Sequence, residues 1–307
     1  MPASDLCLLT VHAHPDDEAS KGSATVARYA AEGVRTVLVT CTGGEAGEIL
    51  NPAADTPEAR ADLAGVRRRE LDRAVEAIGY SKLYLLGYHD SGMPDTEVNA
   101  RPDNFANAPL EEAVGRLVEI VRAERPQVIV TYGDDQSRYP HPDHLRVHDV
   151  SVAAFDDAGN PQRYPDAGEP WQPSKLYYVN AFTKERLLFL HTYLSEHGEE
   201  SPFAAWLEGI PDDLVDPTTT RIDVSGFLSA RREGLLAHAT QVAPDSLWFK
   251  VPEEVIRQEF PWEDYVLARS LVEPATHEEE GYEADLFAGV RDAPGQRPPD
   301  ARSAARR

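Results

Sequence analysis

The sequence predicts an α/β fold built on a doubly wound, mostly parallel sheet, with a C-terminal α+β elaboration. Short apolar runs alternate with amphipathic helical patterns through the first half of the chain, which is the order that β-α-β units produce. The runs are almost continuously apolar, as are strands covered on both faces of a parallel sheet. Each unusual polar loop follows one of these runs. Because such sheets bind ligands at the carboxyl ends of their strands, the loops indicate a site at that edge.

The first half contains four predicted strands separated by three predicted helices. Apolar, β-branched or aromatic residues dominate the strand segments, which are residues 6–13, 36–41, 83–87 and 128–132. The helical patterns cover residues 23–32, 57–78 and 109–124. Pro57 and Pro109 stand where a helix can begin, and Gly33 and Gly79 stand where one can end. The four strands are therefore expected to run parallel, with helices as the connections between them.

The second half is expected to elaborate this sheet. Helical patterns cover residues 142–157, 184–197 and 226–239, and strand patterns cover residues 176–182 and 218–224. The Pro-, Gly- and Asp-rich stretch 156–173 is predicted to be a long ordered loop. We expect one domain over residues 1–275, with an N-terminal half at about 1–160 and the elaboration at about 161–275. The tail over 276–307 is expected to be disordered at least in its last part.

The composition argues against several function classes. The chain of 307 residues carries 30 Lys and Arg against 53 Asp and Glu, which is a formal net charge of −23. A field of this sign repels phosphate backbones and anionic lipids, so neither nucleic acid nor a membrane is expected as a partner. Cys7 and Cys41 form no C-x-x-C pair, so no disulfide framework or thiolate zinc site is predicted. The N-terminal run LCLLTV is too short for a signal peptide or a membrane span, and we expect a cytoplasmic location.

Two short motifs carry residue types that bind metals. In HPDDE, His14 and Asp17 are three residues apart where a strand runs into a helix, so their side chains can converge on one cation. In HPDH, His141 and His144 have the same spacing after the fourth predicted strand. Two histidines and one carboxylate match a catalytic zinc set, which keeps one coordination position open for water. Soft ligands are absent from both motifs, which argues against an iron–sulfur or purely thiolate site.

Each motif also holds titratable residues that a metal would not need. If Asp17 binds the cation, Asp16 points elsewhere and becomes a candidate general base. If His144 binds it, His141 is free to stabilise an oxyanion or to donate a proton. Asp143 can hydrogen-bond a neighbouring imidazole and determine its tautomer. Metal, base and oxyanion partner would then all come from two short segments.

A structural interpretation competes with this one. Asp16, Asp17 and Glu18 precede a predicted helix, where carboxylates commonly cap the helix N-terminus. Histidines three residues apart also occur by chance. The metal interpretation is favoured because the two motifs supply complementary ligand types, and both follow the carboxyl ends of predicted strands.

The motifs resemble those of the LmbE-like superfamily of N-acetylglucosaminyl deacetylases, which are zinc enzymes with a Rossmann-like fold. HPDDE alone is typical of the superfamily. The combination of DDEASKGSATVARYA, TCTGGEAGEILNPA, GYHDSGMP, YPHPDH, RYPDAGEPW and AHATQ is similar to the actinobacterial mycothiol branch, and within it to the mycothiol S-conjugate amidases. The similarity extends from about residue 6 to about residue 290 and leaves only the tail uncovered.

The resemblance implies a role for the residues of both motifs. His14, Asp17 and His144 are implied as the ligands of one Zn²⁺ per chain, and Fe²⁺ would suit the same ligands. Asp16 is implied as the general base, and His141 as the electrostatic partner of the oxyanion. Tyr139 matches a family tyrosine that helps to polarise the substrate carbonyl. Without the resemblance, this tyrosine would be interpreted as packing at the end of a strand.

Four further positions are implied as substrate contacts. Lys21 matches a lysine that marks the S-conjugate amidases, where the biosynthetic deacetylases carry a small polar residue; alone, it would be interpreted as a solvated lysine. Arg67 matches an arginine that contacts the sugar–inositol part of the substrate, or else it belongs to a salt-bridged helix face. Asp90 matches a carboxylate that accepts hydrogen bonds from sugar hydroxyls, or else it serves a turn. Glu48 is expected at the edge of the site, unless it is simply a polar loop residue.

The resemblance implies hydrolysis of the amide bond in mycothiol S-conjugates, which are the expected small-molecule partners. The products would be an N-acetylcysteine S-conjugate and glucosaminyl-inositol, in thiol-dependent detoxification. One alternative is deacetylation of N-acetylglucosaminyl-inositol in mycothiol biosynthesis, against which Lys21 and the GEILNP loop argue. A relative acting on a natural-product thiol conjugate would carry the same residues. A non-catalytic metal-binding or sugar-binding protein should have lost Asp16 or His141, and this chain keeps both.

Overall fold

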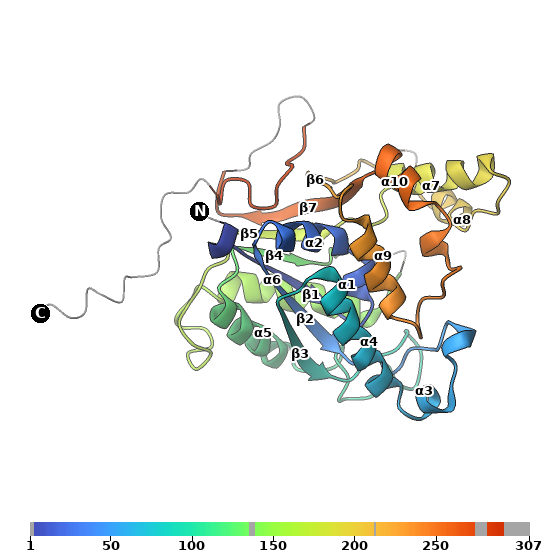
Figure 1. The fold of residues 1–307 in the computed structure, drawn as a ribbon. Coiled ribbons are helices and arrows are strands. Elements are labelled where there is room, and N and C mark those ends of the chain that lie inside the picture. The colour runs from blue at the N-terminus through green and yellow to red at the C-terminus, as the bar shows by residue number, and fades with distance from the viewer. Residues whose placement is uncertain (1–2, 135–138, 212, 274–280, 292–307) are drawn as a thin grey trace, which may run out of the picture.

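A seven-stranded sheet with helices on both faces organises the protein (Figure 1), in a computed structural model that describes residues 3–134, 139–211, 213–273 and 281–291. The strand order is β3-β2-β1-β4-β5-β7-β6. The strands are β1 (Cys7–His12), β2 (Arg35–Thr42), β3 (Lys82–Tyr88), β4 (Val128–Thr131), β5 (Lys175–Val179), β6 (Thr220–Asp223) and β7 (Trp262–Ser270). Strands β1 to β5 pair in parallel, and β7 runs antiparallel to both of its neighbours. The structure thereby confirms the predicted doubly wound, mostly parallel sheet.

Successive residues of the central strands enter two separate cores. Leu8 packs in the core on one face, and the next residue, Leu9, packs in the core on the other. The same alternation holds for Leu38 and Val39 on β2. Because side chains alternate between the faces of a strand, a strand covered on both faces needs apolar residues at consecutive positions. This explains the nearly continuous apolar runs of the sequence.

The helices form one layer on each face of the sheet, with a third group at its β5–β7–β6 end (Figure 1). Helices α5 and α6 contribute to one core, and α2, α4 and α9 contribute to the other. The described helices are α1 (Asp17–Ser20), α2 (Ser23–Ala31), α3 (Pro57–Ala61), α4 (Leu63–Ile78), α5 (Leu110–Glu124), α6 (Pro142–Asp157), α7 (Lys184–Glu196), α8 (Ala204–Glu208), α9 (Leu228–Ala237) and α10 (Glu253–Glu259). Short 3₁₀ helices cover Ala3–Asp5, Pro52–Ala54 and Leu247–Phe249.

Several elements differ from the sequence-based expectation, including the short helices α8 and α10, which were not predicted. The helix predicted over 57–78 is divided at Asp62, whose side chain accepts a hydrogen bond from Gly65 N at 2.9 Å and so caps the start of α4. Strand β7 was not predicted, although it lies between β5 and β6 in the sheet. Its segment mixes charged and apolar residues, and its burial is only partial beyond Tyr265, so its pattern is weaker than that of a strand buried on both faces.

The ordered part of the domain reaches beyond the boundary expected near residue 275. Leu286 and Phe287 are fully buried, and the Phe287 ring meets Tyr29 edge-on with centroids 5.2 Å apart. Glu283 accepts a hydrogen bond from the buried Lys175 at 2.7 Å. Residues 281–291 are therefore part of the packed domain, whereas residues 276–280 and 292–307 of the predicted tail lie outside the described residues.

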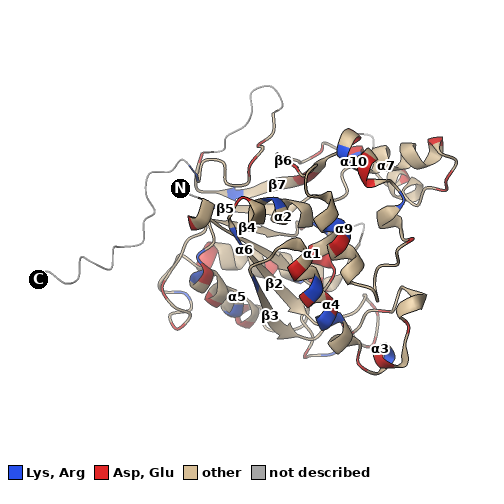
Figure 2. Ribbon diagram, viewed as in Figure 1, with Lys and Arg blue, Asp and Glu red and all other residues tan. Residues whose placement is uncertain are grey.

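Charge is distributed unevenly over the helices (Figure 2). Acidic residues occur on most of the peripheral helices, whereas α4 carries a run of arginines, Arg67 to Arg69. Cys7 and Cys41 are both buried and free. No helix within the described ranges is both long and apolar enough to cross a bilayer.

The sheet positions the polar loops at a reversal in strand order. The chain moves from β1 to β2 on one side, and β4 lies on the other side of β1. The loops leaving the carboxyl ends of β1 and β4 therefore lie next to each other, which is the usual ligand-binding position of an open α/β sheet. These two loops carry the HPDDE and HPDH motifs.

Candidate metal centre and active site

The loops after β1 and β4 bring His14, Asp17 and His144 together. One potential ligand atom from each residue lies within 4.8 Å of the other two, and all three residues are buried. Asp17 Oδ2 is 3.3 Å from His14 Nδ1 and 3.4 Å from His144 Nε2. His144 Nε2 is buried and has no hydrogen-bond partner among the described residues. Since buried polar atoms normally have partners, this nitrogen suits the role of a metal ligand.

Asp143 orients the imidazole ring of His14 within this cluster. Its Oδ2 lies 3.2 Å from His14 Nε2, which favours a proton on Nε2 and leaves the lone pair of Nδ1 directed at Asp17. Asp143 is itself held by Ser91, whose backbone N–H donates to Oδ2 at 2.9 Å and whose hydroxyl donates to Oδ1. A carboxylate that orients a metal-binding imidazole is a common arrangement in metalloproteins.

A second group of potential ligands overlaps the first. His14, Asp90, His141 and Asp143 also offer atoms within 4.8 Å of one another. In this group Asp143 is occupied by Ser91, and Asp90 Oδ1 accepts a hydrogen bond from Gly92 N at 2.8 Å. These carboxylates therefore hold the imidazoles in place, and the donor set with an unsatisfied atom is His14, Asp17 and His144.

His141 directs its Nε2 toward Asp90 and the cluster. Its Nδ1 accepts a hydrogen bond from Asp143 N at 3.2 Å and so caps α6. The neutral ring must then carry its proton on Nε2, which lies 3.9 Å from Asp90 Oδ1. Burial, together with the electrostatic effect of the neighbouring His14, lowers the pKa of His141 to about 4. In this arrangement His141 is a neutral hydrogen-bond donor at neutral pH.

Asp16 lies beside the cluster in a left-handed backbone conformation, with φ of 106°. This conformation is uncommon for a residue other than glycine. Arg67 Nη2 donates to Asp16 Oδ2 at 2.9 Å. Burial raises the pKa of Asp16, while Arg67 acts in the opposite direction. The result is a half-buried carboxylate next to the candidate metal ligands.

The segment that carries Asp16 is further held by buried charges. Asp16 N donates to Glu18 Oε2 at 2.9 Å, and Glu18 Oε1 is paired with His238. Glu18 and His238 are fully buried. Arg67 adds hydrogen bonds to the carbonyl oxygens of Gly44, at 2.6 Å, and Pro15.

Lys21 contacts the opposite side of Asp17 from the histidines. Its ammonium group donates to Asp17 Oδ1, whereas Oδ2 faces His14 and His144. Although burial opposes it, the Asp17 carboxylate raises the pKa of Lys21. The lysine thus remains charged within reach of any ligand that lies on the cluster.

Tyr139 lies over the two histidines of the second motif. Its ring centroid is 6.0 Å from that of His141, in a stacked orientation, and 5.3 Å from that of His144. The side chain is 55% exposed, so it covers the cluster from the solvent side. Tyr139 borders residues 135–138, which are not described.

The structure gathers nearly all of the residues selected from the sequence. Those within this hydrogen-bonded cluster or packed on it are His14, Asp16, Asp17, Lys21, Arg67, Asp90, Tyr139, His141, Asp143 and His144. Glu48 is exposed on the loop after β2, where its carbonyl oxygen accepts a hydrogen bond from Gln241 at 3.0 Å. Arg67 and Asp90 face Asp16 and the histidines, which the sequence did not indicate.

Sequence reasoning missed Ser91 and the pairing of Glu18 with His238. Ser91 follows Asp90 in the sequence HDSG, and the composition of that segment indicated only a turn. Glu18 belongs to the HPDDE motif, but its partner lies 220 residues away. No local pattern signals such a pair.

Comparisons with known proteins agree with the fold and the motifs. The family described as PIG-L, GlcNAc-PI de-N-acetylase, matches residues 9–155. The mycothiol S-conjugate amidase of Streptomyces coelicolor is 42% identical over 294 residues, which are 94% of this chain and 98% of that protein. A 1D-myo-inositol 2-acetamido-2-deoxy-alpha-D-glucopyranoside deacetylase of Frankia alni is 43% identical over 296 residues, 91% of this chain and 99% of that protein.

A solved structure shows the same fold. The N,N'-diacetylchitobiose deacetylase of Pyrococcus horikoshii superposes with a TM-score of 0.60 at 18% identity, over 87% of this chain and 85% of that one. At this level of identity, the likeness is one of fold.

Proposed function

The chain belongs to the PIG-L/LmbE-like family of hydrolytic enzymes, and we propose that it hydrolyses the amide bond of mycothiol S-conjugates. The products would be an N-acetylcysteine S-conjugate and glucosaminyl-inositol. The observation that carries this proposal is the position of Lys21. The S-conjugate amidases that the chain resembles carry a lysine there, and in this structure its ammonium group contacts Asp17 beside the cluster. A substrate on the cluster would lie within reach of that charge.

We propose that His14, Asp17 and His144 hold one Zn²⁺ ion. Two imidazole nitrogens and one carboxylate oxygen suit a catalytic zinc site. His144 Nε2 forms no hydrogen bond within the described residues, which supports this assignment. The same donors suit Fe²⁺. When bound, the ion supplies a Lewis acid that activates water and polarises a carbonyl oxygen.

Asp16 is proposed as the general base that accepts a proton from the attacking water. Its carboxylate is adjacent to the cluster without belonging to it, and Arg67 restricts its orientation. A base held in one orientation avoids the entropic cost of finding the reactive geometry. Arg67 is therefore proposed to position the base, in addition to any contact with the sugar–inositol part of the substrate.

His141 and Tyr139 are proposed to stabilise the negative charge that develops on the carbonyl oxygen. The Nε2–H of His141 is available as a donor because Nδ1 already accepts a hydrogen bond. Donors fixed in place before reaction stabilise an oxyanion without reorganisation. A neutral His141 is a poor proton donor, so we propose that protonated Asp16 delivers the proton to the leaving amine.

The test offers two substrates to the metal-loaded protein side by side and measures amine release. One is a mycothiol S-conjugate, and the other is N-acetylglucosaminyl-inositol. We expect preferential cleavage of the S-conjugate, and a Lys21→Ser variant should reduce that preference. Preference for N-acetylglucosaminyl-inositol would replace this proposal with the second candidate, a biosynthetic deacetylase. That candidate is favoured by the deacetylase relatives, whose identity to this chain equals that of the amidase relative within a few per cent.

A further inference from the structure

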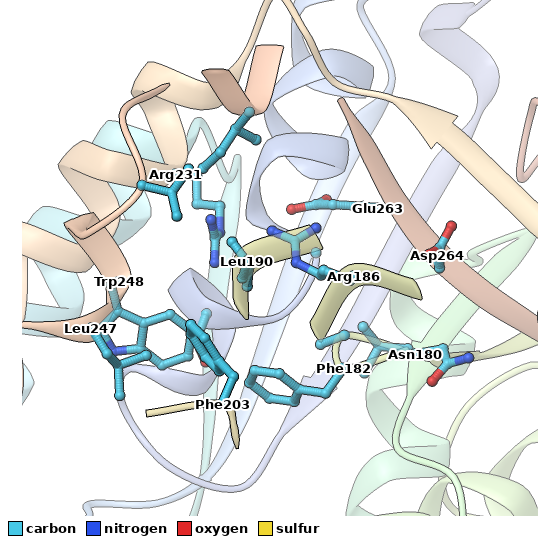
Figure 3. Close-up of a pocket in the computed structure, with 16 residues that line it drawn as sticks. Asn180, Phe182, Arg186, Leu190, Phe203, Arg231, Leu247, Trp248, Glu263 and Asp264 are labelled. Atoms are coloured by element: carbon cyan, nitrogen blue, oxygen red, sulfur yellow. The ribbon is translucent and has the colours of Figure 1, made fainter. Parts of the chain in front are cut away.

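A pocket at the β5–β7 end of the sheet has no role in the chemistry described above (Figure 3). It lies between the end of β5, the start of β7, and helices α7, α9 and α10. Its walls are largely apolar, and the residues that form them include Phe182, Leu190, Phe203, Leu247 and Trp248. Apolar walls with a few convergent polar groups are typical of small-molecule sites.

The polar groups in this pocket include two guanidinium groups. Arg186 of α7 and Arg231 of α9 extend into it from different helices (Figure 3). The side chain of Arg186 makes one hydrogen bond within the described chain, from Nη1 to Trp262 O at 3.0 Å. Arg231 has no hydrogen bond or ion pair with any described residue, and its guanidinium carbon lies 5.7 Å from the centre of the Trp248 ring. Burial and the charge of Arg186 lower the pKa of Arg231 to about 10.

The two carboxylates that line the same pocket are already engaged. Glu263 accepts hydrogen bonds from Thr25 N at 2.8 Å and Ala24 N at 3.4 Å, in the first turn of α2. Asp264 Oδ1 lies 3.2 Å from Arg221 Nε. Neither carboxylate forms an ion pair with Arg186 or Arg231 among the described residues, although the chain as a whole has a net charge of −23. Burial lowers the pKa of Arg186, and Glu263 and Asp264 oppose this shift from nearby. The pocket therefore keeps two guanidinium groups that form no ion pair with a described residue.

The apolar walls and the two guanidinium groups together indicate which kind of ligand this pocket would bind. Half-buried guanidinium groups lose hydration, and an opposite charge compensates for that loss. A planar guanidinium group matches the two oxygens of a carboxylate. The aromatic walls favour an apolar body attached to the carboxylate. An uncharged apolar ligand would fill the space but leave both guanidinium groups without an ion-pair partner.

We propose that this pocket binds a carboxylate carried on an apolar body, and that in the enzyme reaction this group is the S-substituent of the conjugate. The first part stands on the pocket alone, and the second rests on the proposed function. Ser20 and Gly22 line the pocket, and Lys21 between them contacts Asp17. The pocket thus begins next to the segment that carries the proposed metal ligands, where a group on the acyl side of the scissile amide can enter it.

Binding is tested with 4-phenylbutyrate and its neutral match, 4-phenylbutyramide, by calorimetry on the metal-loaded protein. We expect the carboxylate to bind at least tenfold more tightly than the amide. Arg231→Met and Arg186→Met should each remove most of that difference. Arg232→Met is the matched control, because Arg232 is an exposed residue on the same helix, and it should keep the difference. Thermal unfolding confirms that each variant is folded. Equal binding of the two probes, or an unchanged difference in the folded Arg231→Met and Arg186→Met variants, would overturn the site.

The substrate assignment is tested separately, through kcat/KM for two mycothiol conjugates that carry S-(4-carboxybenzyl) or S-(4-carbamoylbenzyl) groups. We expect the carboxylate conjugate to be preferred, and Arg231→Met to reduce that preference at least tenfold while Arg232→Met does not. If phenylbutyrate binds as expected but the preference is absent or insensitive to Arg231, the pocket serves a free carboxylate and the S-substituent assignment is wrong. If neither conjugate is hydrolysed, the proposed function fails, and the calorimetry still decides the pocket.

Discussion

Arg67 Nη2 donates a hydrogen bond to Asp16 Oδ2 over 2.9 Å, and the two residues are 51 positions apart in the chain. The arginine side chain is 4% exposed, and its Nη1 and Nη2 groups also donate to the carbonyl oxygens of Gly44 and Pro15. An arginine in this setting has little freedom to move. It therefore connects α4 rigidly to the loop that carries the proposed base.

Replacing Arg67 should impair catalysis through Asp16. We expect Arg67→Met to bind the metal normally and to lose about 10- to 100-fold in kcat, the range typical of residues that support a catalytic group. Arg67 lowers the pKa of Asp16, so its removal should raise that pKa. A base must be ionised to act, and the acidic limb of the kcat/KM profile should move to higher pH.

The matched control for this change is Arg68→Met, since Arg68 is exposed on the same helix and, within the described residues, pairs with Asp72. It should leave both kcat and the pH profile unchanged. A profile for Arg67→Met that coincides with that of the parent would argue against the positioning role.

Replacing Asp16 itself should separate metal binding from turnover. We expect Asp16→Asn to retain one equivalent of metal and to lose about 10²- to 10⁴-fold in kcat, which is the usual contribution of a general base. Metal analysis and amine release on the same preparation check both parts. Near-full activity of a metal-loaded Asp16→Asn protein would exclude this residue as the base.

The two histidines of HPDH should respond differently to substitution. His144→Ala removes a buried nitrogen that forms no hydrogen bond within the described residues, and we expect it to lose the metal. His141→Ala removes a donor whose other ring nitrogen serves the α6 cap, and it should retain the metal while kcat falls. Inductively coupled plasma mass spectrometry after dialysis measures the stoichiometry. A His144→Ala protein that holds a full equivalent would contradict the ligand assignment.

Ser91 should affect the affinity for the metal although it is not a proposed ligand. Its backbone and hydroxyl groups both hold Asp143, and Asp143 orients His14. We expect Ser91→Ala to weaken metal affinity by about 10- to 100-fold, measured by competition with a chelating dye. Ser195→Ala, at an exposed position on α7, is the control. Equal affinities in the two variants would show that the Ser91 hydroxyl is dispensable for the site.

The C-terminal segment should contribute to stability through one buried pair. Lys175 and Glu283 have 0% and 1% exposed side chains, and their charged groups are 2.7 Å apart. We expect Lys175→Met to reduce the free energy of unfolding by about 3–5 kcal/mol, because it leaves a buried carboxylate without its cation. Urea unfolding measures this. Lys175→Met combined with Glu283→Gln should recover part of the loss, and a strictly additive double variant would argue against coupling between the two charges.

The sequence by itself determined the class of fold and the chemical character of the site. The apolar runs that became β1 and β2 are continuous because each residue along them enters one core or the other, as Leu8 and Leu9 do. His14 and Asp17 are close along the chain, as are His141 and His144, so their spacing already predicted that both motifs can supply ligands to one cation. These features depend on periodicity and on residues a few positions apart, which a single chain displays directly.

Only the tertiary structure decided which partners these residues meet. Asp16 meets Arg67 from α4, and His14 meets Asp143 from α6 with Ser91 behind it. Strand β7 enters the sheet between β5 and β6, and it brings Glu263 to the start of α2. Each of these contacts joins segments that are far apart in sequence, and their distance in space depends on strand order and helix packing. Local sequence patterns do not indicate the strand order or the helix packing. Hydrogen bonds and ion pairs act over a few ångströms in space, whatever the separation of the two residues along the chain.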